Sequence, residues 1–176
     1  KTLFPYTTLF RSSRNQKIAA ATAAAVAIAI PAEGLRRTAY YDPPGVLTIC
    51  YGHTGKDVQA HKTYTLEECK ALLDKDMANA LAAVDRCAPG APWQVLAAFG
   101  DAVYNAGPTI ACDKSKSTAA RLLAAEKWEE ACRQLPRWDK SRIGGVFISL
   151  PGLTKRRAKE MELCLSYKAP SLGVQG

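Results

Sequence analysis

Residues 33–55 of this 176-residue chain read EGLRRTAYYDPPGVLTICYGHTG, and they combine a helix end, a turn and a short strand. An apolar, alanine-rich segment precedes them, so we expect Glu33 at the C-terminal end of a helix. Asp-Pro-Pro-Gly at 42–45 is typical of a turn, and the β-branched alternation of 46–51 predicts a strand. The side chains of Glu33, Asp42 and Thr48 are therefore expected on a helix end and a hairpin that pack together.

Two carboxylates in such different surroundings suit glycoside hydrolysis. One carboxyl group must keep a proton for the leaving oxygen, and the other must stay ionised to activate or hold a water molecule. The apolar helix before Glu33 favours a protonated acid, whereas the polar turn around Asp42 favours a carboxylate. Two carboxylates nine residues apart are weak evidence by themselves, since most such pairs are solvated surface charges.

The complete motif, EG-L-R-x-x-A-Y-x-D-x-x-G-x-x-T-I-x-x-GH-T-G, is far more specific and resembles the phage-type lysozymes of glycoside hydrolase family 24. The resemblance implies that Glu33 is the general acid, that Asp42 positions and activates the water, and that Thr48 holds it. It implies hydrolysis, with inversion, of the β-1,4 bond between N-acetylmuramic acid and N-acetylglucosamine in peptidoglycan, which lyses the host cell. It also suggests that Tyr104 and Asn105 bind substrate in the saccharide cleft, although an asparagine at a helix end can be only a cap.

The expected fold is α+β and mainly helical. It is a lysozyme-like fold in which a small β-hairpin subdomain lies beside a helical lobe, with the cleft between them. Thr65 and Glu68 predict a capping box at the start of a helix over 65–87. Residues 93–105 predict a second, mostly buried helix that Gly107 ends. Shorter helices are predicted over 118–127, 128–135 and 153–166.

The formal net charge is +8, which suits an anionic polymer as partner. Half of this excess lies before Glu33, where there are four basic residues and no acidic one: Lys1, Arg11, Arg14 and Lys17. The remaining excess is mild, and the basic triplet at 155–157 is interpreted as a solvated helix face. We therefore expect peptidoglycan rather than nucleic acid as the partner, and a monomeric protein.

Residues 18–32, IAAATAAAVAIAIPA, carry no charge and follow basic residues, a pattern typical of membrane targeting. As a helix they span about 22 Å, less than the roughly 30 Å of the hydrocarbon core, so insertion is expected to be weak. A cleaved signal peptide and a plain alanine-rich helix of a cytosolic protein are alternatives. Together with the lysozyme motif, the segment is similar to those of the signal-arrest-release (SAR) endolysins of lambdoid phages.

That similarity implies export to the host periplasm, tethering to the bacterial inner membrane through residues 18–32, and later release. Residues 1–17 are then a basic tail, and residues 1–12, which differ in composition, are expected to be partly non-native. Residues 33–167 form the catalytic domain and residues 168–176 a C-terminal tail.

Six widely spaced cysteines without a C-x-x-C pair disfavour a zinc ribbon and a redox motif and favour disulfides in an exported protein. Six cysteines allow 15 connectivities, of which we take pairing of sequence neighbours as the hypothesis; free thiols in a cytosolic protein are the alternative. The hypothesis joins Cys50 to Cys69, Cys87 to Cys112, and Cys132 to Cys164.

His53 is expected to have a structural role near the site, paired with a carboxylate and bracing the hairpin. Only one other histidine exists, so no metal and no cofactor are predicted.

Three rival functions remain open at this stage. A lytic transglycosylase needs Glu33 but not a water held by Asp42 and Thr48. A non-catalytic wall-binding protein needs none of the three. A membrane-disrupting protein would act through residues 14–32 alone.

Overall fold

The computed structural model of the chain describes residues 6–42 and 45–168, and most of them are helical. The α-helices are α1 (Tyr6–Glu33), α2 (Leu66–Cys87), α3 (Trp93–Ala106), α4 (Thr109–Cys112), α5 (Thr118–Ala124), α6 (Trp128–Cys132) and α7 (Pro151–Leu165). Two 3-10 turns are η1 (Leu135–Trp138) and η2 (Ser166–Lys168). Strands β1 (Arg36–Tyr41), β2 (Leu47–Cys50) and β3 (His53–Thr54) form an antiparallel sheet in that order, and β4 (Lys140–Ile143) pairs with β5 (Val146–Ser149). The expectation of a mainly helical α+β fold is confirmed.

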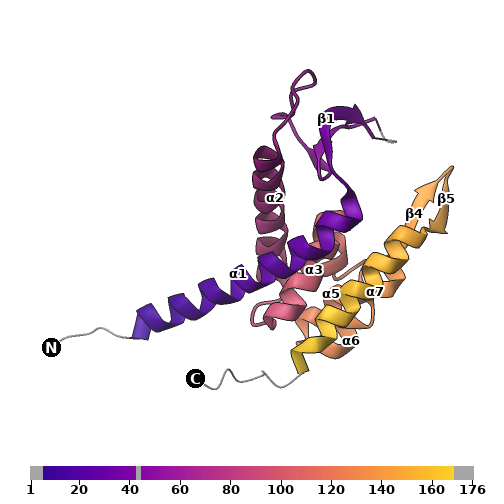
Figure 1. Cartoon of the computed structure of the whole chain (residues 1–176). Coiled ribbons are helices and arrows are strands. Elements are labelled where there is room, and N and C mark those ends of the chain that lie inside the picture. The colour runs from indigo at the N-terminus through magenta and orange to yellow at the C-terminus, as the bar shows by residue number, and fades with distance from the viewer. Residues whose placement is uncertain (1–5, 43–44, 169–176) are drawn as a thin grey trace.

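Helix α1 crosses the helical body and ends at Glu33, beside the small sheet (Figure 1). Ala21, Ala25 and Ala29 are fully buried, and their spacing of four places them on one face of the helix. Small side chains on that face let α1 pack closely on α3, with further contacts to α2 and α7. The helix begins at Tyr6, so residues 6–17 continue it where the sequence predicts a tail, and Pro31 lies inside it near its end.

In the part of the chain that the structure describes, no helix is both long enough and apolar enough to cross a membrane.

The pair α2–α3 forms the centre of the core. The predicted capping box is confirmed: the Thr65 hydroxyl accepts from the Glu68 N–H at 3.1 Å, and the Glu68 carboxylate accepts from the Thr65 N–H at 2.8 Å. Gly100 of α3 lies directly against α2, because a Cβ atom there would come within 2.4 Å of Leu81 Cδ2. Close packing of these two helices therefore needs a glycine at this position.

Three disulfides link the outer elements to this core, and the neighbour-pairing hypothesis is confirmed. Cys50–Cys69 joins β2 to α2, Cys87–Cys112 joins the end of α2 to α4, and Cys132–Cys164 joins α6 to α7. All six cysteines are paired in this way, which contradicts the free-thiol alternative.

The hairpin β4–β5 is absent from the sequence prediction. Gly144 and Gly145 have φ of 57° and 88°, which suits the two central residues of a tight hairpin turn between flanking strands. The Gly-Gly pair before Val-Phe-Ile was the available sequence signal. Helix α7 begins at Pro151, two residues before the predicted start, because proline is well suited to the first turn of a helix.

Candidate active site

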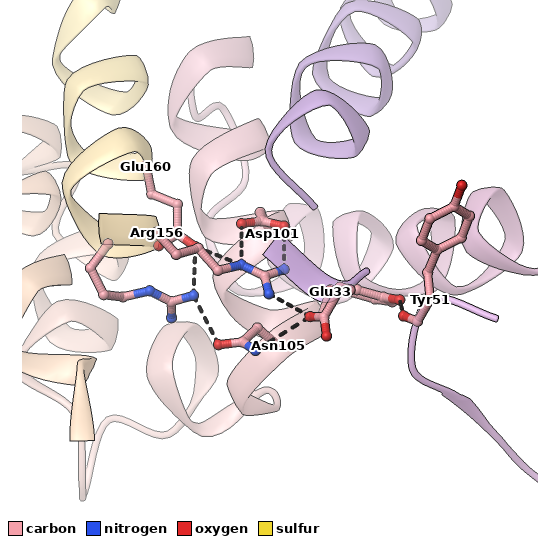
Figure 2. A network of polar contacts seen from close by, with 8 residues as sticks. Glu33, Tyr51, Asp101, Asn105, Arg156 and Glu160 are labelled. Atoms are coloured by element: carbon pink, nitrogen blue, oxygen red, sulfur yellow. Dashed lines mark hydrogen bonds and ion pairs between the residues drawn. The ribbon is translucent and has the colours of Figure 1, made fainter. Parts of the chain in front are cut away.

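Glu33 lies where α1, α3 and α7 meet, and its side chain is 22% exposed (Figure 2). Its Oε1 atom accepts a hydrogen bond from Nη1 of Arg156 and another, of 3.4 Å, from Nδ2 of Asn105. On the sheet side, a Cβ atom built on Gly52 would lie 3.5 Å from Glu33 Oε2. The helix end and the hairpin thus pack together around this carboxyl group, as the sequence predicts.

Asp42 and Thr48 are fixed on one turn of the sheet through the backbone of Val46. The Asp42 carboxylate accepts from the Val46 N–H at 2.7 Å, and the Thr48 hydroxyl donates to the Val46 carbonyl at 3.0 Å. Thr48 is buried, whereas Asp42 is half-buried. The structure therefore brings these two predicted site residues together and gives each a defined orientation.

Tyr104 and Asn105 lie at the C-terminal end of α3, next to Glu33. Asn105 bridges two charged groups, because its Oδ1 atom accepts from Arg157 at 3.0 Å while its Nδ2 atom donates to Glu33. The Tyr104 hydroxyl donates to the Tyr51 carbonyl of the sheet. Burial, helped by the negative charge of Glu33, raises the pKa of Tyr104 well above its usual range, so the phenol stays a donor.

An open hollow of 360 Å³ runs beside Tyr104, between the β2–β3 turn, α2 and α3. Its polar lining includes Thr54, Asp76 and Asn79. Hydroxyl, carboxylate and amide groups beside a tyrosine ring provide the mixture of hydrogen-bonding and apolar surface that a sugar needs.

Arg156 and Arg157 are buried, so the interpretation of the basic triplet as a solvated face is wrong for these two; Lys155 is exposed as expected. Arg156 forms a bidentate pair with Asp101 of α3, with Nε–Oδ2 and Nη2–Oδ1 distances of 2.8 and 2.7 Å. Arg157 lies 2.6 Å from Glu160. Carboxyl groups from three helices surround Arg156, which offsets the cost of burying it, whereas Nε and Nη1 of the buried Arg157 have no hydrogen-bond partner among the described residues.

The charge state of Arg156 follows from these partners. Burial acts against its positive charge, but the hydrogen bonds and charges of Asp101 and Glu33 outweigh burial and raise the pKa of Arg156 above its usual range. Sequence reasoning missed both Asp101 and Arg156. The available signal was an aspartate inside a helix predicted to be mostly buried, since a buried acid needs a cationic partner.

His53 is buried between two carboxylates. Its Nδ1 atom is 2.6 Å from Asp76 of α2, and its Nε2 atom is 3.2 Å from Asp57. The contact with Asp76 connects the sheet to α2. We keep the prediction that the role of His53 is structural.

A helical lobe, a small antiparallel sheet and a glutamate held at their junction define a lysozyme-like protein. The family model described as phage lysozyme matches residues 31–160 of the chain. The chain is 39% identical over 163 residues to the SAR-endolysin of bacteriophage PS34, covering 86% of this chain and 93% of that protein. It is also 39% identical over 134 residues to the SAR-endolysin of Enterobacteria phage P21, covering 76% and 77% respectively.

Solved structures agree with these matches. The active form of the P1 phage endolysin Lyz is similar with a TM-score of 0.70 and 27% identity, over 81% of this chain and 83% of that one. The muramidase domain of SpmX from Asticaccaulis excentricus gives a TM-score of 0.71 at 27% identity, over 81% and 95%. This chain belongs to the phage lysozyme family. The predicted class of enzyme, a lysozyme-type glycoside hydrolase, is thereby confirmed.

Proposed function

We propose that this protein is an endolysin that hydrolyses the β-1,4 bond between N-acetylmuramic acid and N-acetylglucosamine, with Glu33 as its general acid. The main support is the placement of the Glu33 carboxyl group, which Arg156 and Asn105 hold at the junction of the helical lobe and the sheet. A fixed orientation matters because a general acid must reach the leaving oxygen within hydrogen-bonding distance.

In this mechanism Glu33 donates its proton to the glycosidic oxygen while a water molecule attacks the sugar carbon from the opposite face. Asp42, as a carboxylate, removes a proton from that water, and the Thr48 hydroxyl holds the water in place. The shared contact of both side chains with Val46 supports these roles, since it keeps the base and the hydroxyl at a constant separation. Inversion follows when a water fits between the two carboxyl groups.

Tyr104 and Asn105 are proposed to contact the saccharide. Tyr104 lines the hollow beside Glu33, and Asn105 donates to the Glu33 carboxylate. The hollow extends from the β2–β3 turn along α2 and α3, and sugar units on one side of the cleaved bond are proposed to lie there.

We also propose that the protein is exported, remains tethered to the inner membrane through residues 18–32, and is then released. The SAR-endolysin relatives and the disulfides support this proposal, because disulfides persist in oxidising compartments. In the released protein the same segment is the part of α1 that packs on α3 and ends at Glu33. A tethered segment would hold Glu33 at the membrane surface, away from Arg156.

Digestion of purified peptidoglycan by the wild type and by Glu33→Gln tests the catalytic proposal, with mass analysis of the products. We expect products with reducing N-acetylmuramic acid ends from the wild type and at least a hundredfold slower release from the variant. Glu162→Gln, an exposed position on α7, is the matched control and should keep full activity. Anhydro sugars would identify a transglycosylase, and equal activity of wild type and Glu33→Gln would overturn the assignment of the acid.

Fractionation of expressing cells tests the tether. We expect the protein in the membrane fraction while the membrane potential is intact, and in the soluble fraction, active and of unchanged mass, after the potential is collapsed. A shorter mature protein would show a cleaved signal peptide instead. Activity from a protein that stays membrane-bound at full potential would contradict the proposed mechanism.

A further inference from the structure

The Arg156 guanidinium group contacts three carboxyl groups: it pairs with Asp101 and Glu33, and its Nε atom lies 3.7 Å from Glu160 (Figure 2). Asp101 engages two of its nitrogen atoms, Nε and Nη2, side by side. The third nitrogen, Nη1, donates to Glu33. A bidentate pair fixes the plane of the guanidinium group, so Asp101 determines the direction in which Nη1 points.

Burial raises the pKa of Glu160 to about 10, so of the two buried carboxyl groups in the cluster it is Asp101 that offsets the charge of the arginines. Asp101, Arg157 and Glu160 are 0% exposed and Arg156 is 4% exposed, which gives two cations and two carboxyl groups away from water. Glu33 adds a third carboxyl group at the edge of this set. Because Asp101 offsets the charge of Arg156, the arginine can orient Glu33 while bringing less net positive charge to its carboxyl group.

Other groups around Glu33 come from each element packed against it. Helix α3 contributes the uncharged Tyr104 and Asn105, α2 contributes Asp76, which lines the same hollow as Tyr104, and the sheet approaches with Gly52. Helix α7 adds Arg157, which donates to Asn105. Arg156 is the cation in contact with Glu33 among the described residues. A change in the charge of Asp101, the partner of Arg156, is therefore expected to alter the electrostatic environment of Glu33.

We propose that Asp101 is a positioning residue for the catalytic acid: it aims Nη1 of Arg156 at Glu33 and offsets part of the positive charge that Arg156 places beside that carboxyl group. This inference rests on the proposed role of Glu33. According to this proposal, the fully buried Asp101 does not contact the substrate but influences the pH range in which the enzyme works.

The pH dependence of kcat/KM on purified peptidoglycan, for the wild type and Asp101→Asn, tests the proposal. The variant removes the carboxylate that pairs with Nε and Nη2 of Arg156. Glu160, 3.7 Å from Nε, replaces it poorly because burial raises the pKa of Glu160, so more of the positive charge of Arg156 acts on Glu33. We expect the alkaline limb of the profile to move down by roughly one pH unit, so that activity falls about tenfold on that limb and stays within a few-fold at low pH. Asp85→Asn is the matched control, because Asp85 also pairs with an arginine, Arg14 at 2.7 Å, but far from the site.

Arg156→Lys provides a second measurement if Asp101→Asn does not fold, as judged by its circular dichroism and melting curve. A single ammonium group cannot serve both carboxylates, and the fully buried Asp101 keeps it, so Glu33 loses its cation. The alkaline limb should then move to higher pH, opposite to the effect of Asp101→Asn. A uniform loss of activity at every pH, with both limbs in place, would show a merely structural role and overturn the inference.

The two proposals fail in different ways. If Glu33→Gln is inactive while the alkaline limb of Asp101→Asn and that of Arg156→Lys do not move, only the role of Asp101 is wrong. If Glu33→Gln is active, the proposed acid itself is wrong.

Discussion

At the scale of single residues, Gly52 shows how closely the sheet approaches the proposed acid. Its φ of +88° favours glycine, and an alanine Cβ would lie 3.5 Å from Glu33 Oε2. Gly90 has a similar φ of +85° with nothing within 4 Å of its Cβ position. We expect Gly52→Ala and Gly90→Ala each to lower the free energy of unfolding by about 1 kcal/mol in urea titrations. Only Gly52→Ala should also lower muramidase activity, because its methyl group would contact Glu33 Oε2; equal activities would show that the Gly52–Glu33 contact is unimportant.

The proposed site was predictable from sequence only where its residues are neighbours in the chain. Glu33, Asp42 and Thr48 fall within one motif, so spacing and residue type were enough to select them. Arg156 is 123 residues away from Glu33, and nothing in its local pattern distinguishes it from a solvated lysine or arginine. Its burial depends on Asp101 of another helix, a contact that no local periodicity can specify.

At the scale of elements, the strongest predictions were those with a local physical cause. The capping box fixed the start of α2, and helical periodicity located α3. The ends of elements that depend on packing against distant residues were harder to predict from the sequence. Helices α5 and α6 end earlier than predicted, at Ala124 and Cys132. The hairpin β4–β5 was missed because the four residues of β5 are all exposed and lack the polar–apolar alternation that identifies a half-buried strand.

Helix α1 provides the prediction that belongs to this scale. Ala25 is fully buried in the tightly packed face of α1, and Ala23 is exposed on the same helix. Leucine at either position raises the hydropathy of residues 18–32 equally, but only Ala25→Leu overpacks the helix interface. We expect Ala25→Leu to lower the free energy of unfolding by about 1–3 kcal/mol and Ala23→Leu to change it little, in denaturant titrations of the purified proteins. If the two variants are equally stable, residues 18–32 do not dock as the structure shows.

At the scale of the whole molecule, helix α1 belongs both to the hydrophobic core and to the proposed active site. Helix α1 packs on α2, α3 and α7, and it carries Glu33 at its last position. If residues 18–32 begin in a membrane, as we propose, then release completes the core and the active site in one step. The core without α1 must meanwhile stay folded, and the three disulfides are suited to this because none of them involves α1.

The three disulfides are therefore expected to differ in their effects on stability and on activity. Sequence separations of 19, 25 and 32 residues predict, from loop entropy, that replacing Cys132–Cys164 by serines destabilises most and replacing Cys50–Cys69 least, over a range of about 0.5 kcal/mol. Activity should follow a different order, because Cys50–Cys69 ties to α2 the strand that carries Thr48. We expect the Cys50→Ser/Cys69→Ser protein to lose the most activity at temperatures where all three variants remain folded by circular dichroism. If activity loss instead parallels stability loss across the three variants, the disulfides act only on the core, and the sheet holds its catalytic geometry without them.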